Sequence, residues 1–123
     1  MDVRVKRVYE PAERSDGYRI LIDRLWPRGV SHERARLDAW ERDLAPSAAL
    51  RTWFGHEPGR FDEFRTRYIG ELRGQRALLS ELRRRARRGT LTLVYAARDT
   101  HRNDAVVLAE VIRAGLPRVT DRA

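Results

Sequence analysis

Residues 91–97 of the chain read Leu91-Thr92-Leu93-Val94-Tyr95-Ala96-Ala97. Thr92 is the only polar member of this run, so a strand formed by it would be apolar on both faces. Strands of that kind lie in the interior of a sheet, because both of their faces are covered. We therefore predict a strand from Leu91 to Ala97 at the centre of a sheet.

A second strand is predicted over residues 18–25, whose centre Ile20-Leu21-Ile22 is also apolar on both faces. Residues 3–8 alternate less regularly and indicate an edge or half-buried strand. The polar loop between these two segments, residues 11–17, is too short to hold a helix. Whether the two strands pair directly, and in which sense, stays open.

Most of the remaining chain carries apolar residues at helical spacing. The predicted helices run from Ser31 to Leu44, from Ser47 to Gly55, over 61–72, over 78–88 with a kink or boundary near Gly74, and from Asn103 to Gly115. Val119 is assigned to a short terminal strand. Strands separated by helices predict an α/β fold: one layered domain over residues 1–123, with a small, partly parallel sheet of three or four strands covered by helices.

The composition excludes several classes of protein. The chain has 123 residues and no cysteine, which excludes disulfide scaffolds, thiolate zinc sites, iron–sulfur clusters and a cysteine nucleophile. Dinucleotide-binding and P-loop glycine motifs are absent, and the three histidines match no metal-binding spacing. We therefore predict no cofactor and no bound metal. Without a membrane-length apolar run or a secretory signal, we predict a cytoplasmic protein with no membrane partner.

Two polar clusters follow the two apolar strands, residues 23–29 and residues 98–103. Ligands of open α/β sheets bind beyond the carboxyl ends of the strands, so parallel strands would bring these clusters to one crevice. Each cluster holds a carboxylate and arginines, and the second also begins a helix whose free N–H groups attract anions. These features predict binding of a small anionic ligand, phosphorylated or nucleotide-like. The structural alternative is an ion pair, Asp23–Arg98 or Arg24–Asp99, that only fixes the strand ends.

Individual roles follow from this interpretation. The candidate catalytic residues are Asp23, His56 and Asp99, as general acids or bases in a hydrolase or transferase. The candidate ligand-binding residues are Arg24, Trp26, Arg28, Gly29, Trp53, Arg98 and Asn103. Two of these assignments have structural alternatives: Trp26 as a plug at the sheet edge, and His56 as a surface residue after a helix end.

The net charge of +8 is concentrated in residues 58–90, which hold ten arginines against four acids. A run of arginines ends the predicted helix there: Arg83, Arg84, Arg85, Arg87 and Arg88. Such a run supports an alternative function as a nucleic-acid-binding accessory protein. It is also what the helix dipole favours at a C-terminus. A protein–protein module is a third possibility, and the sequence gives no oligomeric state.

Several long motifs resemble a known bacterial family. They are the strings at 17–29, 44–47, 53–56, 64–68, 95–100 and 103–108. With them the chain resembles domain-of-unknown-function family 488, in its YeaO-like branch, from about Val3 to Leu116. The resemblance implies a small cytoplasmic bacterial α/β protein and a shared purpose for the polar motif residues, but it assigns no reaction. In this branch a lysine is expected where Arg98 stands, a change that would preserve anion binding.

Overall fold

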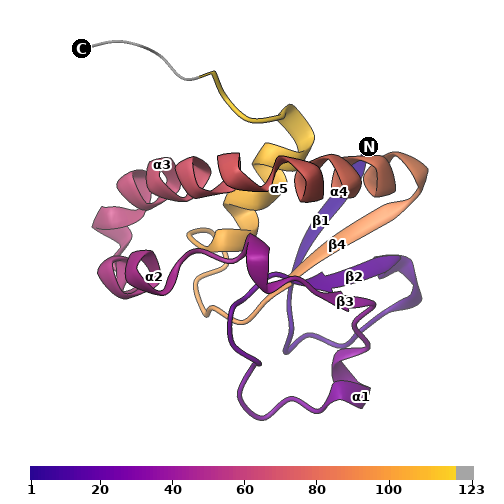
Figure 1. The fold of residues 1–123 in the computed structure, drawn as a ribbon. Coiled ribbons are helices and arrows are strands. Elements are labelled where there is room, and N and C mark those ends of the chain that lie inside the picture. The colour runs from indigo at the N-terminus through magenta and orange to yellow at the C-terminus, as the bar shows by residue number, and fades with distance from the viewer. Residues whose placement is uncertain (119–123) are drawn as a thin grey trace.

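The computed structural model describes residues 1–118. Its sheet has four strands: β1 (Asp2–Arg7), β2 (Tyr18–Leu21), β3 (Ala39–Trp40) and β4 (Thr90–Tyr95), in the order β1-β4-β2-β3. All three pairings are parallel, so the four carboxyl ends lie along one edge (Figure 1). The central position predicted for residues 91–97 is confirmed. Because β4 lies between β1 and β2, the first two strands do not pair directly.

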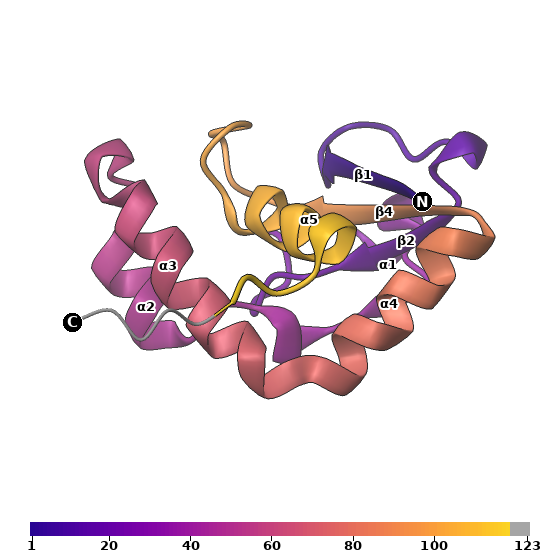
Figure 2. The same ribbon diagram turned by 90° about the horizontal axis from the view of Figure 1, so that it is seen from above.

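Four helices lie on one face of the sheet: α2 (Ala48–Phe54), α3 (Phe61–Leu72), α4 (Arg76–Arg88) and α5 (Asp104–Ala114). Figure 2 shows α5 over the strands, with α3 and α4 running around it as two arms. A 3-10 turn over Arg73–Gln75 joins the arms, so the predicted boundary near Gly74 is confirmed. Ser47 and Asn103 cap α2 and α5 as predicted, accepting from the N–H groups of Leu50 and Val106.

The larger part of the core lies between these helices and the sheet. Ile20, Leu91 and Leu93 on the strands are buried in one apolar cluster that also holds aromatic side chains of α3. Among them is Tyr68, which is fully buried and whose hydroxyl donates to the carbonyl of Leu44 over 2.5 Å. This bond satisfies the one polar group that the tyrosine brings into the core.

The opposite face is covered by an irregular segment instead of the predicted helix from Ser31 to Leu44. Ser31 caps α1 (His32–Ala35), but this helix ends after one turn, where Arg36 adopts a positive φ of 46°. The backbone that follows pairs with the edge of the sheet: the Asp38 N–H donates to the carbonyl of Arg19, and the Glu41 N–H donates to the carbonyl of Leu21. Residues 39–40 thus form β3, because unpaired strand groups outcompete the helical periodicity of this segment.

Both apolar strands end earlier than predicted. The Ile22 N–H still donates to the carbonyl of Val94, but the ladder stops there. Just beyond the end of β4, the Ala96 N–H donates instead to the carboxylate of Asp23 at 2.9 Å. A side chain therefore replaces the backbone partner, and β2 and β4 separate at this point.

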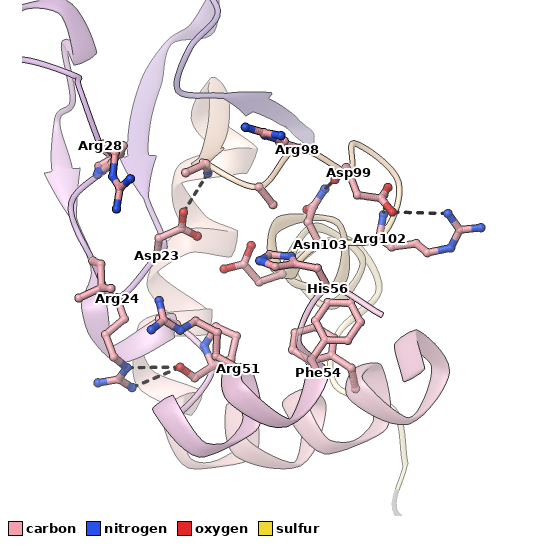
Figure 3. Close-up of a pocket in the computed structure, with 18 of the residues that line it drawn as sticks. Asp23, Arg24, Arg28, Arg51, Phe54, His56, Arg98, Asp99, Arg102 and Asn103 are labelled. Atoms are coloured by element: carbon pink, nitrogen blue, oxygen red, sulfur yellow. Dashed lines mark hydrogen bonds and ion pairs between the residues drawn. The ribbon is translucent and has the colours of Figure 1, made fainter. Parts of the chain in front are cut away.

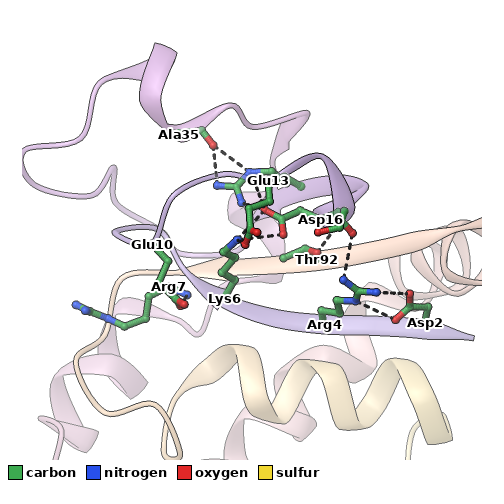
Figure 4. Close-up of polar contacts among 11 residues, drawn as sticks. Asp2, Arg4, Lys6, Arg7, Glu10, Glu13, Asp16, Ala35 and Thr92 are labelled. Atoms are coloured by element: carbon green, nitrogen blue, oxygen red, sulfur yellow. Dashed lines mark hydrogen bonds and ion pairs between the residues drawn. The ribbon is translucent and has the colours of Figure 1, made fainter.

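A polar network, buried at Asp16 and Arg19, supports the irregular face (Figure 4). The Arg19 guanidinium donates to Asp16 at 2.6 Å and twice to the carbonyl of Ala35, while Lys6 donates to Asp16 and Glu13. The bonds to Ala35 attach the segment over residues 22–38 to the sheet. Burial alone would raise the pKa of Asp16, but the Glu13 N–H, Lys6 and Arg19 together lower it below its usual value.

Within residues 1–118, no helix combines the length and apolar character needed to cross a bilayer. The short terminal strand predicted at Val119 lies outside the described residues.

Candidate functional site

A cavity of about 610 Å³ lies at the carboxyl ends of β2 and β4, bounded on its helical side by α2, α3 and the start of α5 (Figure 3). Its position is where ligands bind in open α/β sheets. Apolar surface comes from Leu25, Pro27, Phe54 and Phe64, and charged surface from the two polar strand-end clusters.

Eight of the ten residues selected from the sequence line this cavity: Asp23, Arg24, Trp26, Arg28, His56, Arg98, Asp99 and Asn103. The two clusters, about 70 positions apart in the chain, meet because their strands are neighbours and parallel. Figure 3 shows the carboxylate of Asp23 in the middle of the cavity, with arginine side chains around it.

Two selected residues lie elsewhere. Trp53 packs outside the cavity, with the guanidinium groups of Arg60 and Arg67 at 5.5 and 4.5 Å from its ring. Gly29 is exposed with a φ of 75° and approaches no other group closely, so its role is to permit the turn after Pro27. The predictions that Trp53 and Gly29 contact a ligand therefore receive no geometric support.

Trp26 lines the cavity with only part of its surface. Its ring stacks on His32, with centroids 3.9 Å apart, and meets Trp40 edge to face. Its indole N–H donates to the carbonyl of Val30. These contacts hold the tryptophan against the irregular segment that covers this face of the sheet. They favour the structural interpretation of Trp26 over a role in ligand binding.

The ion pairs considered from the sequence do not form. Asp23 accepts from the Ala96 N–H, and Arg24 donates weakly to the carbonyl of Pro46 at 3.4 Å. Asp99 accepts from the N–H groups of His101 and Arg102, which lower its pKa. The structural alternatives Asp23–Arg98 and Arg24–Asp99 are therefore wrong.

Three arginines of the cavity are free of partners. Within residues 1–118, the guanidinium groups of Arg28, Arg51 and Arg98 have no hydrogen-bond acceptor and form no ion pair. Arg102 forms a 3.5 Å ion pair with Asp99. Sequence reasoning missed Arg51, because an exposed arginine on a short helix carries no signal of the cavity beside it.

Sequence reasoning also missed Asp104, the first residue of α5. Its carboxyl group accepts from the Ala105 N–H at 2.9 Å, and the residue lines the cavity together with Asp23. Burial, and then the negative charge of Asp23, raise the pKa of Asp104 well above its usual value. An acid in the first turn of a helix is common, because it interacts favourably with the helix dipole. Nothing in the sequence therefore indicated a carboxyl pair.

The start of α5 was expected to attract anions through its free N–H groups, and this expectation is wrong for two of them. The N–H groups of Ala105 and Val106 bond to Asp104 and Asn103, so the start of α5 does not offer these amides to an anion. The donors that remain free at this edge of the sheet are therefore those of arginine side chains rather than those of the helix terminus.

His56 lines the cavity in a left-handed conformation, with a φ of 57° directly after Gly55. The described lining contains no serine, threonine, cysteine or lysine, and its one hydroxyl, that of Tyr9, donates to the carbonyl of Arg28. The histidine therefore has no nucleophile of those types beside it to activate. Across residues 1–118, no group of three or more potential metal ligands is present.

Only part of the arginine run at the end of α4 is available for contacts with a nucleic acid. Arg83 donates to the carbonyl of Ile112 at 2.7 Å, and Arg85 lies 3.8 Å above the ring of Tyr18. Arg84, Arg87 and Arg88 are exposed and form no ion pair within the described residues.

Comparisons with known proteins agree with the motif resemblance. The family model described as "Inactive DUF488-N3 subclade" matches residues 2–123. The uncharacterized protein YeaO of Escherichia coli K12 is 44% identical over 114 residues, which cover 93% of this chain and 99% of YeaO. The uncharacterized protein Rv3073c of Mycobacterium tuberculosis H37Rv is 46% identical over 110 residues, covering 89% of this chain and 92% of Rv3073c. No solved structure matches the chain. The chain therefore belongs to the DUF488 family, in the subclade described as inactive DUF488-N3.

Proposed function

We propose that the cavity binds a nucleotide-like organic phosphate and does not chemically transform it. The observation that carries the proposal is the set of three unpaired guanidinium groups, Arg28, Arg51 and Arg98, that line one concave site. Each guanidinium has five donors and a planar shape that matches phosphate oxygens in pairs. Three of them without acceptors around one cavity favour an anion with several oxygens.

The size and lining of the cavity favour a ligand larger than a free phosphate ion. About 610 Å³ lies within the range of small-molecule sites, roughly 300–1,000 Å³. Phe54, Phe64 and Pro27 supply apolar surface for a ring system, while the arginines lie where a phosphate would be held. A nucleoside monophosphate combines these two parts.

Binding without turnover is favoured over the hydrolase or transferase considered from the sequence. The chain has no cysteine, and the described cavity offers no serine, threonine or lysine as a nucleophile. The subclade is itself described as inactive. On this proposal Asp23, His56 and Asp99 position or contact the ligand and transfer no proton.

Nucleic-acid binding through the arginine run is the weaker alternative. Two of its five side chains are engaged within the protein, and the remaining three lie at a solvated helix C-terminus that favours cations in any case. The cavity arginines differ, because they share a concave site with apolar walls.

Calorimetric titration with AMP tests the proposal. Arg28→Ala and Arg98→Ala each remove one charge-assisted contact, worth roughly 1.5–3 kcal/mol, so each should weaken binding about tenfold or more. Arg87→Ala removes the same charge from the surface of α4 and serves as the matched control, with affinity unchanged. Absence of AMP binding to the unmodified protein, or an equal loss in the control, would contradict the proposal.

A further inference from the structure

We infer that Asp23 and Asp104 form a second recognition element in the cavity, which selects nucleotides that carry an amino group on the base. This inference rests on the proposed function and adds a substrate class to it: nucleotides of adenine, cytosine or guanine, as opposed to bases without an amino donor such as uracil.

The two carboxyl groups are fixed and remain accessible to the cavity. Asp23 is oriented by the Ala96 N–H and Asp104 by the Ala105 N–H, each at 2.9 Å and each through one oxygen. Both residues line the cavity, and the negative charge of Asp23 acts on the carboxyl group of Asp104. A carboxylate has about four acceptor positions, so one backbone bond each leaves capacity for a ligand.

Charges of opposite sign face the same cavity without neutralising one another. Neither Asp23 nor Asp104 forms an ion pair within residues 1–118, although five arginines line the cavity with them. Arg28, Arg51 and Arg98 are also without carboxylate partners in that part of the chain. A ligand that spans the cavity with an anionic end and a donor end would complete both sets of contacts.

The chemistry of the carboxyl pair makes it an acceptor. Asp23 and Asp104 both line the cavity, and each carboxyl group keeps lone pairs beyond its one backbone bond. An exocyclic N–H₂ group supplies the donor they lack, whereas a carbonyl oxygen at the same position would meet acceptors and be rejected.

Two matched pairs of probes test the inference by calorimetric titration. Purine riboside 5′-monophosphate differs from AMP only by lacking the amino group, and UMP presents a carbonyl where CMP has its amino group. We expect the amino-bearing member of at least one pair to bind about tenfold or more tightly, because a site built to accept a donor penalises its absence.

Asp104→Asn should reduce that preference to less than about threefold, because the substituted amide places its own N–H₂ group among the acceptors. Glu110→Gln is the control: it alters an exposed acid of α5 that pairs with Arg65, and the preference should persist. Circular dichroism confirms that each variant is folded.

The outcomes separate the two proposals. Equal binding within both pairs, or a preference that survives Asp104→Asn, overturns the amino-group inference while nucleotide binding stands. Failure of all four nucleotides to bind overturns both.

Discussion

At the scale of single residues, the properties of the cavity depend on where each side chain finds its partner. Asp23 and Arg98 could be selected from the sequence because they directly follow apolar strands. Asp104 and Arg51 could not, because their roles arise from the packing of α5 and α2 beside the strand ends. The pairing of charges was also beyond prediction, since Asp23 accepts from the Ala96 N–H and forms no ion pair with Arg98.

The carboxyl pair makes a prediction about stability. Burial and Asp23 raise the pKa of Asp104 in the folded state. Its contribution to stability is complete below the unfolded pKa of about 3.9 and is lost as the pH rises through the raised folded pKa. At neutral pH Asp104→Asn should therefore increase the free energy of unfolding by roughly 1–2 kcal/mol, because the amide has no ionised form that burial and Asp23 disfavour.

Thermal unfolding of both proteins between pH 4 and pH 8 measures this effect. The variant should gain its advantage progressively toward higher pH. A variant that is less stable than the unmodified protein at pH 7, or whose advantage is greatest at pH 4, contradicts the account of this pair.

At the scale of elements, the buried network around Arg19 holds the segment over residues 22–38, which carries Arg24 and Arg28 into the cavity. Asp16→Ala would leave the buried guanidinium of Arg19 without its counter-charge. We expect a loss of about 3–5 kcal/mol in the free energy of unfolding, the range for breaking a buried pair.

Urea denaturation at pH 7 measures this loss, with Asp43→Ala as a control at an exposed acid that forms no ion pair within the described residues. Because the pKa of Asp16 is lowered in the folded state, its contribution is present above the unfolded pKa of about 3.9 and disappears as the pH falls through the folded pKa. Equal losses for the two variants would show that the network does not hold the segment.

The elements also show why local sequence predicted some structure and not the rest. Strands β1, β2 and β4 and helices α2 to α5 each bury their own apolar pattern, so periodicity predicts them. The predicted helix over Ser31 to Leu44 is wrong, because its backbone pairs with a sheet edge formed by a distant segment. Competition of this kind depends on the tertiary fold, which periodicity within one segment does not contain.

At the scale of the whole molecule, the parallel sheet is what creates the cavity. With all pairings parallel and β4 in the centre, both polar clusters lie at one edge. The sequence predicted this edge through the general rule for open α/β sheets, although the strand order itself was open. Most of the net charge of +8 lies in residues 58–90, whereas the cavity arginines lie outside that range, so total charge does not distinguish the two functions.

The most direct test of the central claim is nuclear magnetic resonance of the arginine Nε–Hε groups during a titration with AMP. If the cavity binds the nucleotide, the signals of Arg28, Arg51 and Arg98 shift and saturate, while those of Arg84, Arg87 and Arg88 stay in place. Shifts confined to the three arginines of α4, or no shifts at any arginine, would contradict the claim that this cavity is a nucleotide site.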